Sequence, residues 1–469
     1  MKELPLPNYY NSAQKDPYED ILKDIGQGKN QDMLSKKITL IVPPSPQVPT
    51  PGREFLVTGP FEGFTYIATL IKKMGCQLTV VDCRLKENIY ELVLDNAGDA
   101  DAIGIATYCD SFVFLEEASK LIKEKYPGKL VFFGGPLVTS LPEIILKNTS
   151  ADCAILGEGE LTLIEFFEKY FGPGDKNLSG IKGFAYKESG EIRINPPRPQ
   201  ITNLDNLPFL DYTIWPNCEN IIKNGQILIS SMRGCPQKCS FCFKTIPQLR
   251  LKSVGRFEEE VAYLKKTTNF DYTWLNDLTF NVIEKRAVQI CHIMEKYAVK
   301  YHCFARVNNV SESFAKTLKE TGCQGIWFGI ESYDQDILDA NRKNITIADI
   351  KKALEITKKA GLAARGLFIV GLYGETKESL GKMVDFIKEG SFLPLVKYLV
   401  PFPGTSLYKY AVETGKIKDV PGFLRMLSLR KVRDYDDEII NITDLDEGVL
   451  RGFFHQVWQL TEEKEKCVG

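Results

Sequence analysis

The sequence predicts an α/β protein with two successive α/β halves, and three observations support this fold class. Short runs rich in β-branched and aromatic residues alternate with segments of helical spacing along most of the 469 residues, which indicates βαβ units and parallel sheets. A proline-punctuated linker at 186–222, with Pro196-Pro197-Arg198-Pro199, separates the halves. The last segment, 411–469, has a charged, helical pattern.

The first half covers 37–185 and follows a polar N-terminal extension, 1–36. Its five expected strands are Ile38–Val42, Gln77–Val81, Ala102–Ala106, Leu130–Phe133 and Cys153–Leu156. Helical stretches are expected at 63–74, 112–126, 141–148 and 160–170. This alternation predicts a doubly wound, Rossmann-like (flavodoxin-like) sheet, which binds ligands at the carboxyl ends of its strands.

Loops at those carboxyl ends contain the candidate ligand-binding residues of the first half. They are Thr107, Tyr108, Gly134, Gly135, Gly157 and Glu158. The glycines allow a flat ligand to come close to the backbone.

The second half, 223–410, repeats the alternation with six expected strands. These are Gln226–Ser230, Tyr272–Leu275, Tyr301–Ala305, Gly325–Ile330, Ala363–Val370 and Leu395–Val400. The helical stretches between and after them are 257–267, 283–298, 311–321, 346–360 and 376–389. Six βα units in succession predict a partial TIM-type (β/α)6 barrel, with its functional residues at the carboxyl ends of the strands.

Three cysteines directly follow the first of these six strands. Cys235, Cys239 and Cys242 have the spacing Cys-x3-Cys-x2-Cys. Three thiolates in one loop can hold three irons of a [4Fe–4S] cluster and leave the fourth iron open for chemistry, whereas a structural cluster uses four cysteines. The alternative of three buried core thiols is disfavoured by this spacing. The other nine cysteines are scattered singly, which argues against a second cluster and indicates reduced thiols in a cytoplasmic protein.

Composition argues against two classes of partner. The net charge is −2 and no long basic block occurs, so nucleic acid is not expected to bind. No apolar run approaches the roughly 18–20 residues of a membrane span. The N-terminus lacks the basic-then-apolar order of a signal peptide. We therefore expect a cytoplasmic enzyme with a small-molecule substrate.

The cysteine motif, with Phe241 just before the last cysteine, resembles the Cys-x3-Cys-x-aromatic-Cys motif of the radical S-adenosylmethionine (SAM) enzymes. The resemblance implies that SAM chelates the open iron and is cleaved to a 5′-deoxyadenosyl radical. It further implies that Phe241 lies near the adenine, and that an external donor such as flavodoxin or ferredoxin supplies the electron.

The first half resembles the cobalamin-binding (B12-binding) domain fused ahead of many radical SAM enzymes. The matching pieces are Pro43-Pro44, Val80-Val81-Asp82, Gly104-Ile105-Ala106-Thr107, Gly134-Gly135-Pro136 and Gly157-Glu158-Gly159-Glu160. The resemblance implies that the loop residues named above contact cobalamin. The first histidine of the chain is His292, so we expect Tyr108, with Cys109 second, to lie nearest the cobalt. The alternative is a flavodoxin-like domain that has lost its ligand.

Strand ends of the second half resemble signatures of the same cobalamin-associated group. They are Asn276-Asp277, Arg306, Gly329-Ile330-Glu331-Ser332, Gly371-Leu372-Tyr373-Gly374-Glu375-Thr376 and Pro401-Phe402-Pro403-Gly404-Thr405, with Asn276 and Tyr373 departing from the family pattern. The resemblance implies cofactor contacts for Asp277, Arg306, Glu331 and Ser332. Glu331 can accept hydrogen bonds from the SAM ribose, and Arg306 can pair with the SAM carboxylate. For Arg306 and Asp277 the alternative is a strand-end salt bridge or a helix cap.

These resemblances imply a cobalamin-dependent radical SAM enzyme. The favoured activity is a methyltransferase that moves a methyl group from methylcobalamin to an unactivated carbon, after the deoxyadenosyl radical has abstracted hydrogen. One alternative keeps the cofactors but is an oxidative cyclase or a ring-rearranging enzyme. A second is a non-catalytic corrinoid-binding protein, which the intact cysteine triad disfavours.

Overall fold

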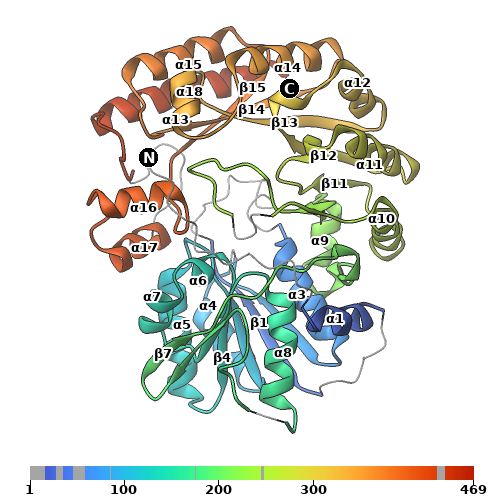
Figure 1. Ribbon diagram of the computed structural model, residues 1–469, viewed down its shortest axis with the longest axis vertical. Coiled ribbons are helices and arrows are strands. Elements are labelled where there is room, and N and C mark those ends of the chain that lie inside the picture. Colours follow the sequence, from blue (N-terminus) through green and yellow to red (C-terminus); the bar gives the residue numbers. More distant parts are fainter. Residues whose placement is uncertain are drawn as a thin grey trace. The chain divides into compact units, whose positions relative to one another are not determined.

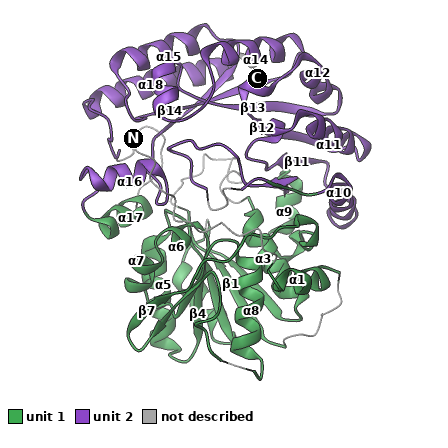
Figure 2. Cartoon of the chain, in the orientation of Figure 1, with its two compact units in different colours: residues 1–226, 250–252, 419–431 green, residues 227–249, 253–418, 432–469 purple. Residues whose placement is uncertain are grey.

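The computed structural model describes residues 16–27, 35–45, 59–84, 86–174, 176–244, 248–429 and 439–468. The chain forms two compact units (Figure 2). Unit 1 comprises residues 1–226, 250–252 and 419–431, and unit 2 comprises 227–249, 253–418 and 432–469. Expected strands and helices recur in both units, which confirms the α/β fold class.

Unit 1 is built on a seven-stranded sheet of order β2-β1-β3-β4-β5-β6-β7 (Figure 1). Its strands are β1 (Lys37–Val42), β2 (Gln77–Asp82), β3 (Ala102–Ala106), β4 (Leu130–Gly134), β5 (Cys153–Ile155), β6 (Phe184–Glu188) and β7 (Glu191–Ile194). The first five are parallel, whereas β6 and β7 are antiparallel. β1, β3 and β4 are almost entirely buried, as expected for parallel strands covered on both faces.

The helices of unit 1 lie on both sides of this sheet (Figure 1). They are α1 (Tyr18–Gly26), α3 (Glu62–Lys73), α4 (Ile89–Ala97), α5 (Phe112–Lys125), α6 (Pro136–Ser140), α7 (Pro142–Lys147), α8 (Gly159–Phe171), α9 (Cys218–Lys223) and α17 (Val420–Leu429). The last of them comes from the C-terminal segment: Arg425 of α17 pairs with Glu116 of α5 at 2.5 Å.

The hairpin β6–β7 is the main feature of unit 1 that the sequence pattern did not reveal. The predicted boundary at residue 185 falls inside β6, and the sheet continues to residue 194. Most residues of β7 are exposed, so this edge strand lacks the apolar pattern by which a buried strand is recognised.

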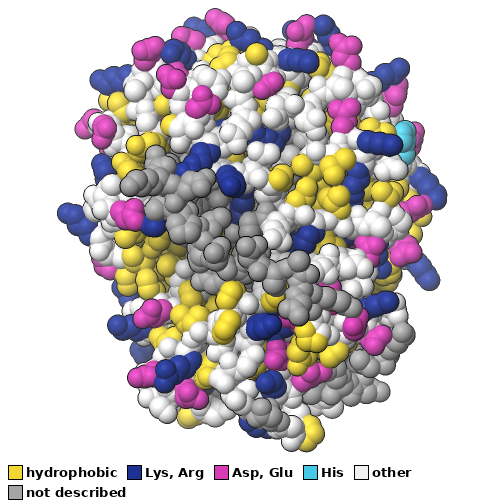
Figure 3. Space-filling model, viewed as in Figure 1, with side chains coloured by type: hydrophobic (Ala, Val, Ile, Leu, Met, Phe, Trp, Pro, Cys, Tyr) yellow, Lys and Arg dark blue, Asp and Glu magenta, His cyan; other side chains and the backbone are white. Residues whose placement is uncertain are grey.

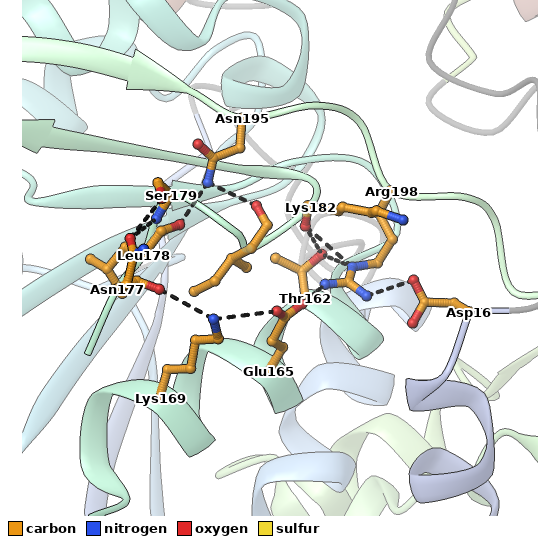
Figure 4. A network of polar contacts seen from close by, with 11 residues as sticks. Asp16, Thr162, Glu165, Lys169, Asn177, Leu178, Ser179, Lys182, Asn195 and Arg198 are labelled. Atoms are coloured by element: carbon orange, nitrogen blue, oxygen red, sulfur yellow. Dashed lines mark hydrogen bonds and ion pairs between the residues drawn. The ribbon is translucent and has the colours of Figure 1, made fainter. Parts of the chain in front are cut away.

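Buried ion pairs join Asp16, just before α1, and Glu165 of α8 to the segment after β7 (Figure 4). Arg198 donates to Asp16 at 2.7 Å, to the carboxylate of Glu165 and to the hydroxyl of Thr162 at 2.9 Å. Its guanidinium also lies over the ring of Tyr18, 5.5 Å from the centroid. Part of the predicted linker is therefore packed into unit 1.

Unit 2 is built on a six-stranded parallel sheet of order β15-β14-β13-β12-β11-β8. Its strands are β8 (Leu228–Ile229), β11 (Tyr272–Leu275), β12 (Lys300–Ala305), β13 (Cys323–Glu331), β14 (Ala364–Val370) and β15 (Leu393–Tyr398). The spatial order follows the chain order, which confirms the predicted partial (β/α)6 barrel.

Helices cover the outer face of this sheet (Figure 1). They are α10 (Val254–Thr268), α11 (Glu284–Lys296), α12 (Glu312–Glu320), α13 (Gln335–Ala340), α14 (Ile347–Lys359) and α15 (Lys377–Glu389), with α16 (Ser406–Glu413) and α18 (Glu447–Val468) after the last strand. Side chains on the outer face, such as Tyr301, Cys303 and Phe328, are buried. Alternate residues on the inner face, such as Trp274, are only half-buried.

Two further observations concern the apolar length of the helices and the charges on the surface. Among the described residues, no helix is long and apolar enough to cross a membrane. Figure 3 shows acidic and basic side chains interspersed over the described part of the visible face, rather than one large basic block.

Candidate cofactor sites

The three cysteines lie in the loop after β9 (Met232–Arg233) in unit 2. Gly234 turns the chain at a φ of +81°, a conformation that favours glycine. Cys235 is buried, and Cys239 and Cys242 are partly buried. The Cys242 amide donates to the Cys239 carbonyl at 3.3 Å, so these two residues share one turn.

The donor set of this loop fits a [4Fe–4S] cluster. Eleven cysteines in the described part of the chain, the triad among them, are free thiols. No three Cys, His, Asp or Glu side chains among the described residues are arranged around a single metal ion. In a [4Fe–4S] cluster each thiolate bonds a different iron, so the three sulfurs need not converge on one point. Burial raises the pKa of Cys242 to about 11, with Cys239 the next contributor; a bound metal deprotonates such a thiol.

Asp277 holds the backbone that leads into the cysteine loop. One carboxylate oxygen accepts hydrogen bonds from the Ser231 and Met232 amides at 2.8 and 3.0 Å, and the other accepts from the Ser231 hydroxyl at 2.5 Å. Arg286 donates to the same serine, at 2.8 Å to its hydroxyl and 2.9 Å to its carbonyl. Asp277 is fully buried, and its carboxylate positions the backbone of Ser231 and Met232; the cofactor contact expected from the sequence stays a prediction.

Glu331 and Lys343 form a buried ion pair at 2.8 Å. Glu331 has a φ of +68°, and a side chain at Gly329 would come within 2.6 Å of its carboxylate. A larger residue two positions before the glutamate would therefore displace this ion pair. The Lys343 ammonium also lies 5.9 Å from the ring centroid of Phe241, which places the predicted adenine-side aromatic beside the predicted ribose-side carboxylate.

Arg306 supports the loop that carries Lys343. Its Nη2 donates to the carbonyls of Lys343 and Asn344 at 2.5 and 2.8 Å. The expected pairing with the SAM carboxylate would have to use the rest of the guanidinium. Ser332 is buried next to Glu331, and its amide donates to the Ile330 carbonyl at 2.9 Å.

Several contacts around the cysteine loop were not foreseen from the sequence. The Cys235 sulfur lies 3.5 Å from the Thr279 hydroxyl. Ser240, between the last two cysteines, bonds to Asn341 through both its amide and its hydroxyl, each at 3.0 Å. Lys343 stands in a polar run, Asn341-Arg342-Lys343-Asn344, where no pattern distinguishes a buried lysine from a solvated one.

Aromatic side chains cluster on the inner face of the unit 2 sheet. This aromatic face consists of Tyr272, Trp274, His302, Phe304 and Trp327. Trp274 stacks on His302 with centroids 4.8 Å apart and meets Trp327 edge-on at 4.9 Å. The Tyr272 hydroxyl bonds to His302 Nδ1. Burial, with the charge of Arg365 second, lowers the pKa of His302 to about 4, so this imidazole is neutral at pH 7.

In unit 1 the loops after β3, β4 and β5 meet at the carboxyl edge of the sheet. The Thr107 amide donates to the Gly134 carbonyl at 2.8 Å. Gly135 has a φ of +123°, and a side chain there would lie 2.7 Å from the Thr107 carbonyl oxygen. Gly157, with a φ of +76°, donates its amide to the Thr139 hydroxyl at 3.0 Å. The structure thus brings four of the predicted cobalamin residues together.

Glu158 has structural partners of its own. Arg250 binds both of its carboxylate oxygens at 2.8 Å, and the Ile201 amide donates to it at 2.9 Å. This carboxylate therefore holds the segment around residue 201.

Tyr108 packs at the end of β3 against Phe61, with ring centroids 4.4 Å apart. The Arg84 guanidinium lies over the ring of Phe61, 5.0 Å from its centroid. Arg84 also forms a buried ion pair with Asp82 at 2.8 Å. Trp215 lies on the same guanidinium at 5.5 Å. Burial raises the pKa of Tyr108 above its ordinary range, which keeps its phenol neutral. Phe61, Arg84 and Trp215 were missed from the sequence because they come from three separate segments.

Both halves of the chain match known protein families. Residues 229–387 match the model of the Radical SAM superfamily, and 55–167 match the B12 binding domain. An uncharacterized methyltransferase of Pyrococcus horikoshii is 31% identical over 396 residues, covering 82% of this chain and 84% of that protein. The bacteriochlorophyllide d C-8(2)-methyltransferase of Chlorobaculum tepidum is 25% identical over 334 residues, covering 68% and 70%.

A solved structure shares the fold. The radical SAM methyltransferase TsrM of Kitasatospora setae aligns with a TM-score of 0.69 at 15% identity, covering 91% of each chain. The two domain matches and the 31% identical relative together identify the family. This chain belongs to the radical SAM superfamily, in the group whose radical SAM domain follows a B12-binding domain.

Proposed function

We propose that this chain is a cobalamin-dependent radical SAM methyltransferase. The observation that carries the proposal is the free thiol triad of Cys235, Cys239 and Cys242, on a loop fixed by Asp277 at the mouth of a parallel barrel. The 31% identical methyltransferase of Pyrococcus horikoshii supports methyl transfer as the activity.

The residues around the triad suit the polar groups of SAM. The three cysteines would hold the cluster, and Glu331 would accept hydrogen bonds from the ribose. Lys343 is a buried cation close to that carboxylate, and it would balance the charge of Glu331 or of the SAM carboxylate. When bound, the cluster supplies the electron that cleaves SAM, and the corrinoid carries the methyl group.

For the corrinoid, unit 1 provides open space beside the backbone of Gly134, and tight turns at Gly135 and Gly157 that favour glycine. We place Thr107 and Tyr108 on the side of the cobalt that faces the sheet edge. A neutral phenol there would be a weak ligand at most, which keeps cobalt easier to reduce.

We place the substrate against the aromatic face of unit 2. Its tryptophans and neutral histidine favour an apolar or unsaturated small molecule over a polyanion. An external flavodoxin- or ferredoxin-type donor is the expected electron source, since one cysteine triad has ligand spacing. The free thiols of the described chain agree with a reducing compartment such as the cytoplasm.

Anaerobic reconstitution with iron, sulfide and hydroxocobalamin tests this function. The wild-type chain should hold one cluster and release deoxyadenosine in the presence of SAM and a reductant. Replacing all three cysteines by alanine should abolish both, and iron near four per chain in that variant would contradict the cluster assignment.

Product mass then separates the activities. A methyltransferase replaces one hydrogen of the substrate by methyl and consumes two SAM per turnover. A cyclase or a rearranging enzyme leaves the carbon count unchanged. A corrinoid carrier releases no deoxyadenosine, and that outcome would exclude catalysis.

A further inference from the structure

Gln200, in the segment after β7, is a buried residue with an unpaired amide. Its exposed fraction is 6%. Among the residues that the structure describes, neither its Oε1 nor its Nε2 has a hydrogen-bond partner. Buried amides are nearly always paired, because leaving them unpaired opposes folding. An orphaned donor and acceptor on one side chain therefore point to a bound group.

The backbone on both sides of Gln200 is held firmly. Two residues before it, Arg198 is fixed by Asp16, Thr162 and Glu165 (Figure 4). One residue after it, Ile201 donates its amide to Glu158 at 2.9 Å and accepts from Arg250 at 2.5 Å through its carbonyl. The backbone that carries Gln200 is therefore held on both sides.

The same contacts place Gln200 next to the ligand-binding edge of unit 1. Glu158, which holds Ile201, directly follows Gly157 in the loop after β5. Doubly wound sheets bind their ligands at this edge. Gln200 is thus one residue away from a backbone amide that the loop after β5 holds.

We propose that Gln200 binds a primary carboxamide on the rim of the cobalamin corrin ring. Carboxamides surround that rim, and each presents one acceptor and a donor pair, which matches the two free functions of a glutamine amide. Nε2 donates to the corrin amide oxygen, and Oε1 accepts from the corrin amide nitrogen. The inference rests on the proposed function, because it requires cobalamin to be the ligand of unit 1.

The substitution Gln200→Met tests this, because it keeps the length of the side chain and removes both polar functions. In the cofactor-free protein it removes an unpaired buried group, so the melting temperature of unit 1 should stay level or rise by about 2–4 °C. In equilibrium dialysis with hydroxocobalamin, the dissociation constant should rise about tenfold. A cofactor-free protein that is no less stable, together with weaker binding of hydroxocobalamin, is the result expected if the residue serves to bind the ligand.

Asn195→Leu is the matched control, five residues earlier in the same segment. The Asn195 amide is paired within the protein, donating to the carbonyls of Leu178 and Ile181 at 2.7 and 2.9 Å (Figure 4). Its loss should lower the melting temperature and leave hydroxocobalamin binding within about twofold of wild type.

Each outcome decides the inference. If Gln200→Met lowers the cofactor-free melting temperature as Asn195→Leu does, or if it and Gln200→Leu both fail to fold, the amide is paired inside the protein and the inference is wrong. If wild type binds hydroxocobalamin and Gln200→Met binds it equally, the inference alone fails. If wild type binds none, the proposed function fails with it.

Discussion

Replacing Asp277 by asparagine tests whether burial or the surrounding hydrogen bonds and charge dominate the pKa of this carboxyl group. Burial raises its pKa to about 6, against hydrogen bonds from Ser231 and Met232 and the charge of Arg286, which lower it. The ordinary pKa is 3.8, and a gap of this size corresponds to about 3 kcal/mol. Because the folded-state pKa lies above the unfolded one, the stabilising contribution is present below pH 3.8 and is lost as the pH rises through 6.

Asparagine cannot titrate, so the pH dependence belongs to the wild type alone. The free energy of unfolding of the wild type minus that of Asp277→Asn should fall by about 2 kcal/mol between pH 4.5 and 7.5. Urea unfolding of the cofactor-free chain, followed by tryptophan fluorescence, measures this difference at each pH.

Asp334→Asn provides a control of opposite sign in the same unit. Burial would raise the pKa of Asp334, but hydrogen bonds from Lys382 and from the first turn of α13 outweigh it and lower the pKa. Its contribution should therefore be lost as the pH falls. If the Asp277 difference also grows with rising pH, the hydrogen bonds and Arg286 outweigh burial and our reasoning is refuted.

Two further predictions concern the cofactors. The variants Glu331→Gln and Arg306→Ala should keep the iron content of the wild type but need a higher SAM concentration for deoxyadenosine release. The reason is that removing one partner of a buried charged pair costs about 2–5 kcal/mol. Wild-type SAM dependence in both variants would contradict these roles. Electron paramagnetic resonance of bound cob(II)alamin should show no nitrogen superhyperfine splitting, because Tyr108 rather than a nitrogen ligand faces the cobalt; a nitrogen splitting would show that the benzimidazole tail or another nitrogen occupies that side.

Local pattern was sufficient to predict most strands and helices of both sheets. Period-two and period-3.6 patterns are carried by neighbouring residues, so they can be read without knowledge of the fold. The position of the cysteine loop after the first barrel strand followed from the same reading, because functional residues of parallel barrels gather at the carboxyl ends of strands.

The hairpin β6–β7 and the membership of α17 in unit 1 were outside the reach of such patterns. The outer strand of the hairpin, β7, is mostly exposed, and the apolar run of β6 is only three residues long. The packing of α17 depends on contacts such as Arg425 to Glu116, which are 309 residues apart in the chain. Neither feature leaves a local signature.

The sequence by itself determined the fold class, the family and the cysteine triad that we propose as the cluster ligands, since each depends on residue type and spacing over short distances. The tertiary structure alone decided which way the polar side chains at the strand ends are turned. Asp277 faces Ser231, Glu158 faces Arg250, and Glu331 faces Lys343. The orphaned amide of Gln200 likewise appears only when burial and partners are known. The physical reason is that a hydrogen bond depends on distance and direction between atoms, and these are set by packing between segments remote in the chain.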